Sequence, residues 1–202
     1  MSFFRTPFWI PLFYPDFLWR VKTDEPALYL SFDDGPVPGP TEFVLSQLVR
    51  YNAKASFFCV GDNILKHRQL YDQLIQQGHA VGNHTQHHLN GWQTDTDIYL
   101  EDFNMCQQNM QTNLFRPPYG RIRRKQAAYI KRSHKIVMWD VLSMDYRLDL
   151  SQEQCLKKSI ESSRTGSIVV FHDSYKAEKN LNYVLPRYLE HFAEKGFKFL
   201  KL

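Results

Sequence analysis

The chain has 202 residues, of which 43% are hydrophobic and 15% aromatic, and its formal net charge at pH 7 is +4. This length and composition predict one folded domain with a sizeable core. The positive charge is mild and mostly scattered, so nothing indicates a nucleic-acid partner. The exception is the run RIRRK at residues 121–125, which is either the solvated start of a helix or a patch for an anionic polymer.

Three cysteines, Cys59, Cys106 and Cys155, lie far apart in the sequence. No CxxC pair exists among them, which argues against a disulfide framework and against a thiolate zinc site. We therefore expect three buried free thiols.

An aromatic segment, FFRTPFWIPLFYPDFLWR, occupies residues 3–20. Its prolines and the charges of Arg5 and Asp16 argue against a membrane-spanning helix, and no small-residue cleavage site of a signal peptide follows it. We expect residues 1–26 to form an extension that packs on the domain, and residues 27–202 to form the domain itself. Contact with a membrane surface through this segment is the less favoured alternative, and the sequence leaves the location open between the cytoplasm and the cell envelope.

Seven apolar runs with strand character follow in order, at residues 27–32, 55–60, 79–84, 114–118, 135–141, 167–172 and 197–202. Helical patterns lie between them, most clearly at residues 41–52 and 181–192, where apolar residues recur every three or four positions. This alternation predicts an α/β fold with a parallel sheet. Seven such units in this length favour a compact barrel, whether closed or incomplete. An open doubly wound sheet is the alternative. No GxGxxG or Walker A motif indicates nucleotide binding.

Polar residues gather where five of the predicted strands end, which is where parallel α/β folds place their chemistry. These residues are Asp33 and Asp34, NHTQHH at 83–88, RPPYG at 116–120, SMDY at 143–146 and FHD at 171–173. Because the carboxyl ends of parallel strands face one mouth, we expect these groups to form a single site.

The histidines predict a metal centre. His84 and His88 are four residues apart, so on a helical turn both rings point the same way. Two imidazoles and one carboxylate hold a divalent metal and leave a position open for water, as in catalytic sites. A pairing of His87 with Asp34 is the weaker alternative. We expect one divalent metal, zinc in the first place, although cobalt, nickel and manganese also suit these ligands.

The two adjacent aspartates can then have different roles. Successive side chains of an extended stretch diverge, so one of Asp33 and Asp34 can bind the metal while the other faces the water as a general base. His172 is the candidate acid for the leaving group, with Asp145 to fix its tautomer and raise its pKa. Arg116 can pair with the non-ligating aspartate, and a backbone N–H after the Pro-Pro turn can hold an oxyanion. These parts predict metal-assisted hydrolysis of an amide or an ester.

Four motifs occur in a recognisable order: SFDDGP at 31–36, HTQHH at 84–88, RPPYG at 116–120 and VFH at 170–172. They resemble the TFDDGP, H-[S/T]-x-x-H, R-x-P-x-G and L-x-H motifs of the polysaccharide deacetylases of carbohydrate esterase family 4, the NodB-homology domain. The resemblance covers roughly residues 27–202. It implies a distorted (β/α)7 barrel with helices outside, and a zinc-like divalent metal.

The resemblance also implies a role for individual residues. Asp33 would be the base, and the metal ligands would be Asp34, His84 and His88. His172 would be the acid, oriented by Asp145. The remaining implied positions are Arg116 as the tether of Asp33, the Tyr119 backbone N–H as an oxyanion donor, and Val170 and Tyr146 as walls of the acetyl pocket.

The sequence departs from the family pattern at the pocket. LSMDY at 142–146 replaces D-[S/T]-x-D-W, and Val170 replaces the usual Leu. All residues that would handle metal and protons are present, so we expect an active enzyme that removes N-acetyl groups from hexosamine residues of a peptidoglycan or chitin-like glycan. O-acetyl ester hydrolysis and hydrolysis of a small amide or imide on the same site are the alternatives. A non-catalytic sugar-binding module is the least favoured one.

Overall fold

Every strand pairs in parallel with its neighbours in the computed structural model, which describes residues 3–202. The strands are β1 (Ala27–Asp33), β2 (Ser56–Cys59), β3 (Ala80–Asn83), β4 (Leu114–Phe115), β5 (Lys135–Ile136), β6 (Val141–Leu142), β7 (Ile168–His172) and β8 (Lys198–Leu200). Their order in the sheet is β5-β4-β3-β2-β1-β7-β6, and β8 pairs with the first half of β1.

One predicted strand, residues 135–141, is divided in two. Its first part, β5, pairs with β4, and its last part, β6, pairs with β7. Between them the Val137 N–H donates to Phe115 O at 2.8 Å, and the Asp140 N–H donates to Ile168 O at 3.0 Å. A single extended segment thus joins the two ends of the sheet. The predicted distorted (β/α)7 barrel is confirmed, but the fifth unit serves two neighbours with two short strands.

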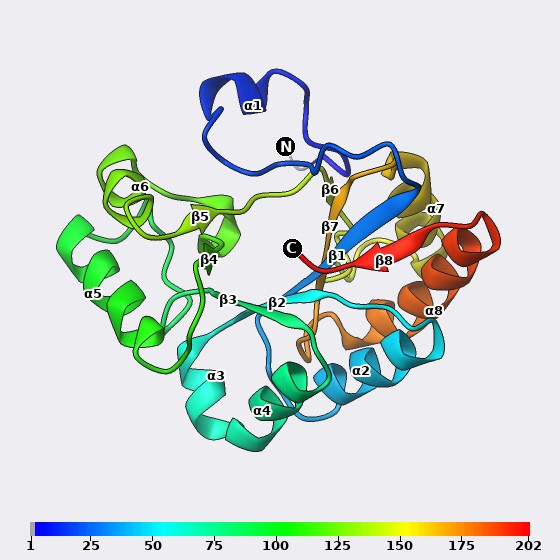
Figure 1. Cartoon of the computed structure of the whole chain (residues 1–202), viewed down its shortest axis with the longest axis horizontal. Coiled ribbons are helices and arrows are strands. Elements are labelled where there is room, and N and C mark those ends of the chain that lie inside the picture. Colours follow the sequence, from blue (N-terminus) through cyan, green and yellow to red (C-terminus); the bar gives the residue numbers. More distant parts are fainter. Residues whose placement is uncertain (1–2) are drawn as a thin grey trace.

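Helices surround the strands on the outside (Figure 1). They are α1 (Ile10–Phe13), α2 (Pro40–Arg50), α3 (Gly61–Lys66), α4 (Arg68–Gln76), α5 (Thr96–Gln107), α6 (Arg124–Ile130), α7 (Gln152–Ser162) and α8 (Glu178–Glu194), with a 3-10 turn, η1, at Pro118–Gly120. The apolar stripe predicted at 181–192 is the buried face of α8, which packs against β7 and α2. Among described residues, no helix is long and apolar enough to cross a bilayer.

Alternation along the strands decides which side chains reach the barrel interior. On β1, Leu28, Leu30 and Phe32 join the core beneath α2 and α8. Tyr29, Ser31 and Asp33 therefore point to the opposite side. On β7, Val169 and Phe171 likewise join the outer core, which leaves Ile168, Val170 and His172 on the inner side. Because Asp33 and His172 are register partners, both end at one mouth of the barrel.

The amino-terminal segment runs beside residues 136–142. Leu18 donates its N–H to Ile136 O at 2.9 Å and accepts the Met138 N–H at 2.8 Å. The Leu142 N–H donates to Phe4 O at 2.9 Å. Helix α1 stands apart from the strands at the top of Figure 1. Phe13, its last residue, is 73% exposed, and Phe8, just before the helix, is 84% exposed. The boundary between an extension and a domain at residues 26 and 27 stays a prediction.

Candidate active site

Three potential metal ligands, Asp34, His84 and His88, come together at the mouth. Their ligand atoms all lie within 4.8 Å of one another. Asp34 Oδ1 is 3.2 Å from His88 Nε2 and 3.8 Å from His84 Nε2. The histidine pairing predicted for 84 and 88 is therefore present, with Asp34 as the carboxylate beside it.

Unusual backbone angles aim two of these side chains. Asp34 directly follows β1, where strand alternation would point its side chain to the outer core. Its φ of 82° turns the chain so that the carboxylate stays at the mouth. His88 has a φ of 57° in the loop after β3. Both values lie in the left-handed region, which L-residues seldom adopt. The Asn63 side chain donates to Asp34 O at 2.7 Å and holds the turn.

The protonation states of the cluster suit a cation. His84 Nδ1 lies 2.7 Å from Arg116 O and donates to that carbonyl, so its Nε2 carries the lone pair toward Asp34. Burial lowers the pKa of His84 to about 4, which keeps the ring neutral. Burial alone would raise the pKa of Asp34, but the hydrogen bond from His88 and the charge of His172 lower it well below its usual range. A carboxylate and two imidazoles at this spacing fit a divalent metal.

Asp33 lies beside this cluster on the inner side of β1 and pairs with Arg116. The Arg116 Nη1 donates to Asp33 Oδ1 at 2.6 Å and to Ser31 Oγ at 2.9 Å. Its other nitrogens donate to the carbonyls of Val137 and Met138. The guanidinium is completely buried against the ring of Phe58. Arg116 thus holds Asp33 in one position and keeps one of its oxygens engaged.

His172, at the end of β7, forms a two-point contact with Asp145. The backbone N–H of His172 donates to Asp145 Oδ2 at 2.8 Å, and the ring Nδ1 of His172 lies 2.7 Å from Asp145 Oδ1. Burial lowers the pKa of His172, but the charge and hydrogen bond of the fully buried Asp145, with further contributions from Asp34 and Asp33, raise it to about 9. Near neutral pH this imidazole can donate a proton from Nε2.

The pocket residues predicted from the sequence lie around the same mouth. Tyr119, with a φ of 60° in η1, packs against His88 with the two rings tilted and their centroids 4.6 Å apart. Tyr146 contacts His172 edge to face at 5.0 Å. Val170 is fully buried two residues before His172, on the inner side of β7.

His87 does not contact Asp34. Its backbone N–H and Nδ1 both bind the carboxylate of Asp102 on α5, at 3.0 and 2.6 Å. The alternative pairing of His87 with Asp34 is therefore wrong, because His87 points to the neighbouring helix. The partner, Asp102, had no recognisable sequence motif.

Sequence reasoning also gave no role to Asp173, which follows His172 directly. Asp173 is fully buried, accepts the Gly35 N–H at 3.2 Å and accepts the Thr41 hydroxyl at 2.6 Å. It thereby braces the turn that carries Asp34. A Cβ on Gly35 would come within 2.0 Å of Asp173 Oδ2, which explains why glycine occupies this position.

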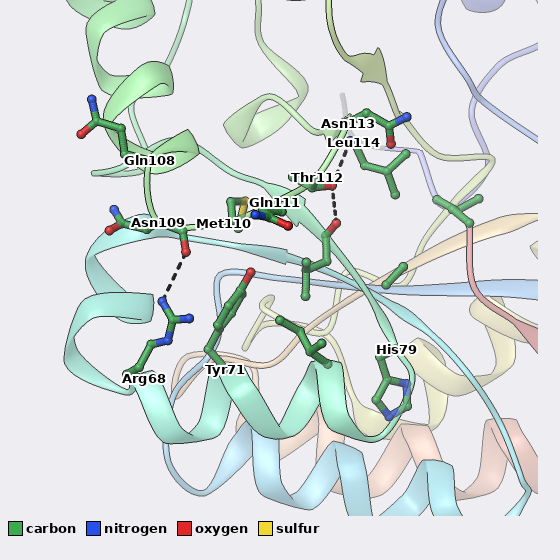
Figure 2. A pocket seen from close by; sticks show the side chains of 14 residues that line it. Arg68, Tyr71, His79, Gln108, Asn109, Met110, Gln111, Thr112, Asn113 and Leu114 are labelled. Atoms are coloured by element: carbon green, nitrogen blue, oxygen red, sulfur yellow. Dashed lines mark hydrogen bonds between the residues drawn. The ribbon is translucent and has the colours of Figure 1, made fainter.

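A cleft of about 700 Å³ lies at the other end of the barrel, at the amino ends of β3 and β4 (Figure 2). Arg68, Tyr71, His79 and Met110 are among its lining residues. None of the predicted site residues lines it. The chemistry-bearing groups therefore converge at the carboxyl ends of the strands, and this cleft is a separate feature.

Comparison with known proteins identifies the family to which this geometry belongs. Residues 20–138 match the family model described as polysaccharide deacetylase. A peptidoglycan-N-acetylglucosamine deacetylase from Bacillus cereus is 29% identical over 90% of this chain and 89% of its own length. The peptidoglycan-N-acetylglucosamine deacetylase PgdA from Listeria monocytogenes is 31% identical over 78% of this chain, but the match spans only 34% of that longer relative.

A solved structure has the same fold over nearly the whole chain. The crystal structure of the Bc1960 peptidoglycan N-acetylglucosamine deacetylase matches with a TM-score of 0.89 and 25% identity, covering 96% of this chain and 95% of its own.

Proposed function

The chain belongs to the polysaccharide deacetylase family, and we propose that it removes N-acetyl groups from hexosamine residues of a glycan. Peptidoglycan is the first candidate polymer, since the relatives from Bacillus cereus and Listeria monocytogenes are named for it. The observation that carries the proposal is the placement of two distinct pairs at one mouth. These are Asp33 with Arg116 beside the metal-ligand cluster, and His172, at the end of the adjacent strand β7, with Asp145.

Asp34, His84 and His88 hold the metal in this proposal, and zinc is the first candidate. When bound, a divalent metal acts as a Lewis acid toward water and the amide carbonyl. The protein contributes one carboxylate and two imidazole rings for it. Its own groups near this position, Asp33 and His172, carry out the proton transfers.

Asp33 is the general base. Its carboxylate takes a proton from water as the water oxygen forms a bond to the acetyl carbonyl carbon. Arg116 occupies Asp33 Oδ1, so the other oxygen faces the water. Because Arg116 is fixed by three further oxygen acceptors, the position of Asp33 is set before the substrate arrives.

His172 is the general acid. As the carbon–nitrogen bond breaks, its Nε2 proton passes to the hexosamine nitrogen, which leaves as an amine, and the acyl group leaves as acetate. Asp145 keeps Nδ1 engaged and stabilises the charged imidazolium. The Tyr119 backbone N–H is the proposed donor to the oxyanion, while Tyr146 and Val170 bound the space for the acetyl methyl group.

Mass spectrometry of the product tests this function. The zinc-loaded protein is incubated with N-acetylglucosamine oligomers, peptidoglycan fragments and an O-acetylated xylan oligomer, and acetate is measured in parallel. The proposal predicts free amines, with equimolar acetate, on at least one of the first two substrates. Acetate from the xylan oligomer alone would instead establish an ester hydrolase.

A further inference from the structure

Two loops at the mouth are bound tightly to each other. One follows β3 and carries His84 and His88, and the other follows β4 and carries Tyr119. The Trp92 Nε1–H donates to Ile122 O at 3.3 Å, and Arg123 Nη2 donates to Trp92 O at 2.7 Å. A Cβ on Gly91 would lie 2.5 Å from Arg121 O, so the two backbones approach closely there.

This junction displays an aromatic ring and a cation near the metal-ligand cluster. Trp92 is 57% exposed, and the Arg121 guanidinium lies 5.3 Å from its ring centroid. Tyr119, which is 60% exposed, packs against the His88 ring. Tyr119 and Ile122 are three residues apart, so their Cα atoms lie at most about 11 Å from each other. The Trp92 ring is hydrogen-bonded to Ile122 O, which places it next to the loop that carries Tyr119.

The charge of the junction has one sign. Residues 121–125 contain Arg121, Arg123, Arg124 and Lys125 and no acid. Within residues 3–202, none of these four cations forms an ion pair with a carboxylate. Asp95, the acid nearest to Trp92 in sequence, caps α5 by accepting the Asp97 N–H. Cations without a carboxylate partner beside an exposed tryptophan indicate a surface for an anionic ligand.

A second cation packed on an aromatic ring lies on the other side of the mouth. Lys176, in the loop after β7, lies 5.4 Å from the ring centroid of Tyr146, and Tyr146 contacts His172. Lys176 is exposed and has no ion pair within the described chain. The candidate site therefore has a cation on an aromatic ring on each side.

From these observations we infer that Trp92 and Arg121 form a subsite for a carboxylate-bearing sugar unit adjacent to the unit that is deacetylated. The inference rests on the proposed function and specifies its substrate as an anionic glycan. A sugar ring packs on exposed aromatic surface, and the guanidinium donates two N–H groups to a carboxylate. Lys176 adds attraction from the opposite side without fixed geometry.

Steady-state kinetics on a matched pair of substrates test the subsite. The substrates are peptide-free glycan fragments of peptidoglycan, which have free carboxylates on their sugar units, and the same fragments with those carboxylates amidated. Neutral N-acetylglucosamine oligomers provide a third arm. Wild-type protein, Arg121→Gln and the control Arg132→Gln are compared with zinc bound. Arg132 is a suitable control because it also lies over an aromatic ring, that of Tyr129, but near the carboxyl end of α6.

We expect wild-type protein to prefer the free over the amidated fragments, with the difference in KM. Arg121→Gln should lower the ratio of the two kcat/KM values about five- to tenfold, as loss of one charge-assisted contact does. Arg132→Gln should leave the ratio unchanged, and added salt should lower the ratio more in the wild type than in Arg121→Gln. Equal rates of the wild type on both fragments, or an unchanged ratio in Arg121→Gln, would overturn the subsite while deacetylation itself stood. Absence of acetate from all three substrates would overturn the proposed function and with it the subsite.

Discussion

Arg116 and Asp33 form an ion pair inside the barrel, with Arg116 completely buried and Nη1 2.6 Å from Oδ1. Ser31 and two backbone carbonyls accept the other bonds of the guanidinium. A buried pair of this kind contributes little net stability, because desolvation offsets the attraction between the charges. Its value lies in orientation, since it fixes the proposed base next to the metal-ligand cluster.

Removing one member of this pair should be costly. We expect Arg116→Met to lower the free energy of unfolding by about 3–5 kcal/mol, because Asp33 would be left buried and unpaired. Lys66→Met is the control, because both side chains of the Lys66–Asp62 pair are exposed. This substitution should change the free energy of unfolding by less than about 1 kcal/mol. Urea unfolding followed by circular dichroism measures both, and equal losses would contradict the account.

Substituting the proposed base should separate turnover from metal binding. Asp33→Asn keeps the shape of the side chain and an acceptor for Arg116, but its amide cannot take a proton from water. We expect kcat to fall about 10²–10⁴-fold, with one metal still bound per chain. Metal content and acetate release are measured on the same sample, and wild-type turnover in this variant would remove Asp33 from the role of base.

The metal ligands can be tested with an internal control. His88→Ala removes an imidazole that lies 3.2 Å from Asp34, whereas His87→Ala alters the neighbouring histidine, which is bound to Asp102. We expect His88→Ala to lose most of its zinc after dialysis and His87→Ala to keep it. Elemental analysis provides the readout. Stoichiometric zinc in His88→Ala, or its loss in His87→Ala alone, would show that the cluster is assigned wrongly.

The pH profile should report His172. The acid must be protonated to act, and its pKa is raised to about 9, so activity should be lost as the pH rises toward that value. A bound cation repels the imidazolium, which places this limb at or below pH 9 in the metal-loaded enzyme. Asp145→Asn removes the carboxylate that raises the pKa, so the limb should move to lower pH and kcat should fall. An alkaline limb that does not move in Asp145→Asn would exclude His172 as the acid.

The sequence predicts the fold well wherever an element has a strong local pattern. The apolar stripe at 181–192 became the buried face of α8, and the run at 27–32 became β1. The pairing of the run at 135–141 could not be predicted, because local sequence does not specify which strands are neighbours in the sheet. It pairs first with β4 and then with β7, which depends on how the barrel closes.

In the candidate site, too, some features follow from local sequence and others depend on tertiary contacts. His84 and His88 come together as predicted, but in a loop after β3 and not on a helical turn. Strand-end position correctly predicted that Asp33, Asp34 and His172 lie at one mouth. The left-handed φ values at Asp34, His88 and Tyr119 could not be predicted, since each is an ordinary L-residue held there by tertiary contacts.

The roles of two supporting residues could not be predicted for a similar reason. Asp173 braces the Asp34 turn through Gly35 and Thr41, and Asp102 holds His87. Their partners are distant in sequence and form no motif with them.

The most direct test of the central claim is acetate release by metal-stripped protein, measured before and after zinc is added back, with N-acetylglucosamine oligomers and peptidoglycan fragments as substrates. The account predicts that stripping abolishes acetate release and that one equivalent of zinc restores it on at least one of the two substrates. Acetate release that persists in the fully stripped protein, or its absence when one zinc is bound, would contradict it.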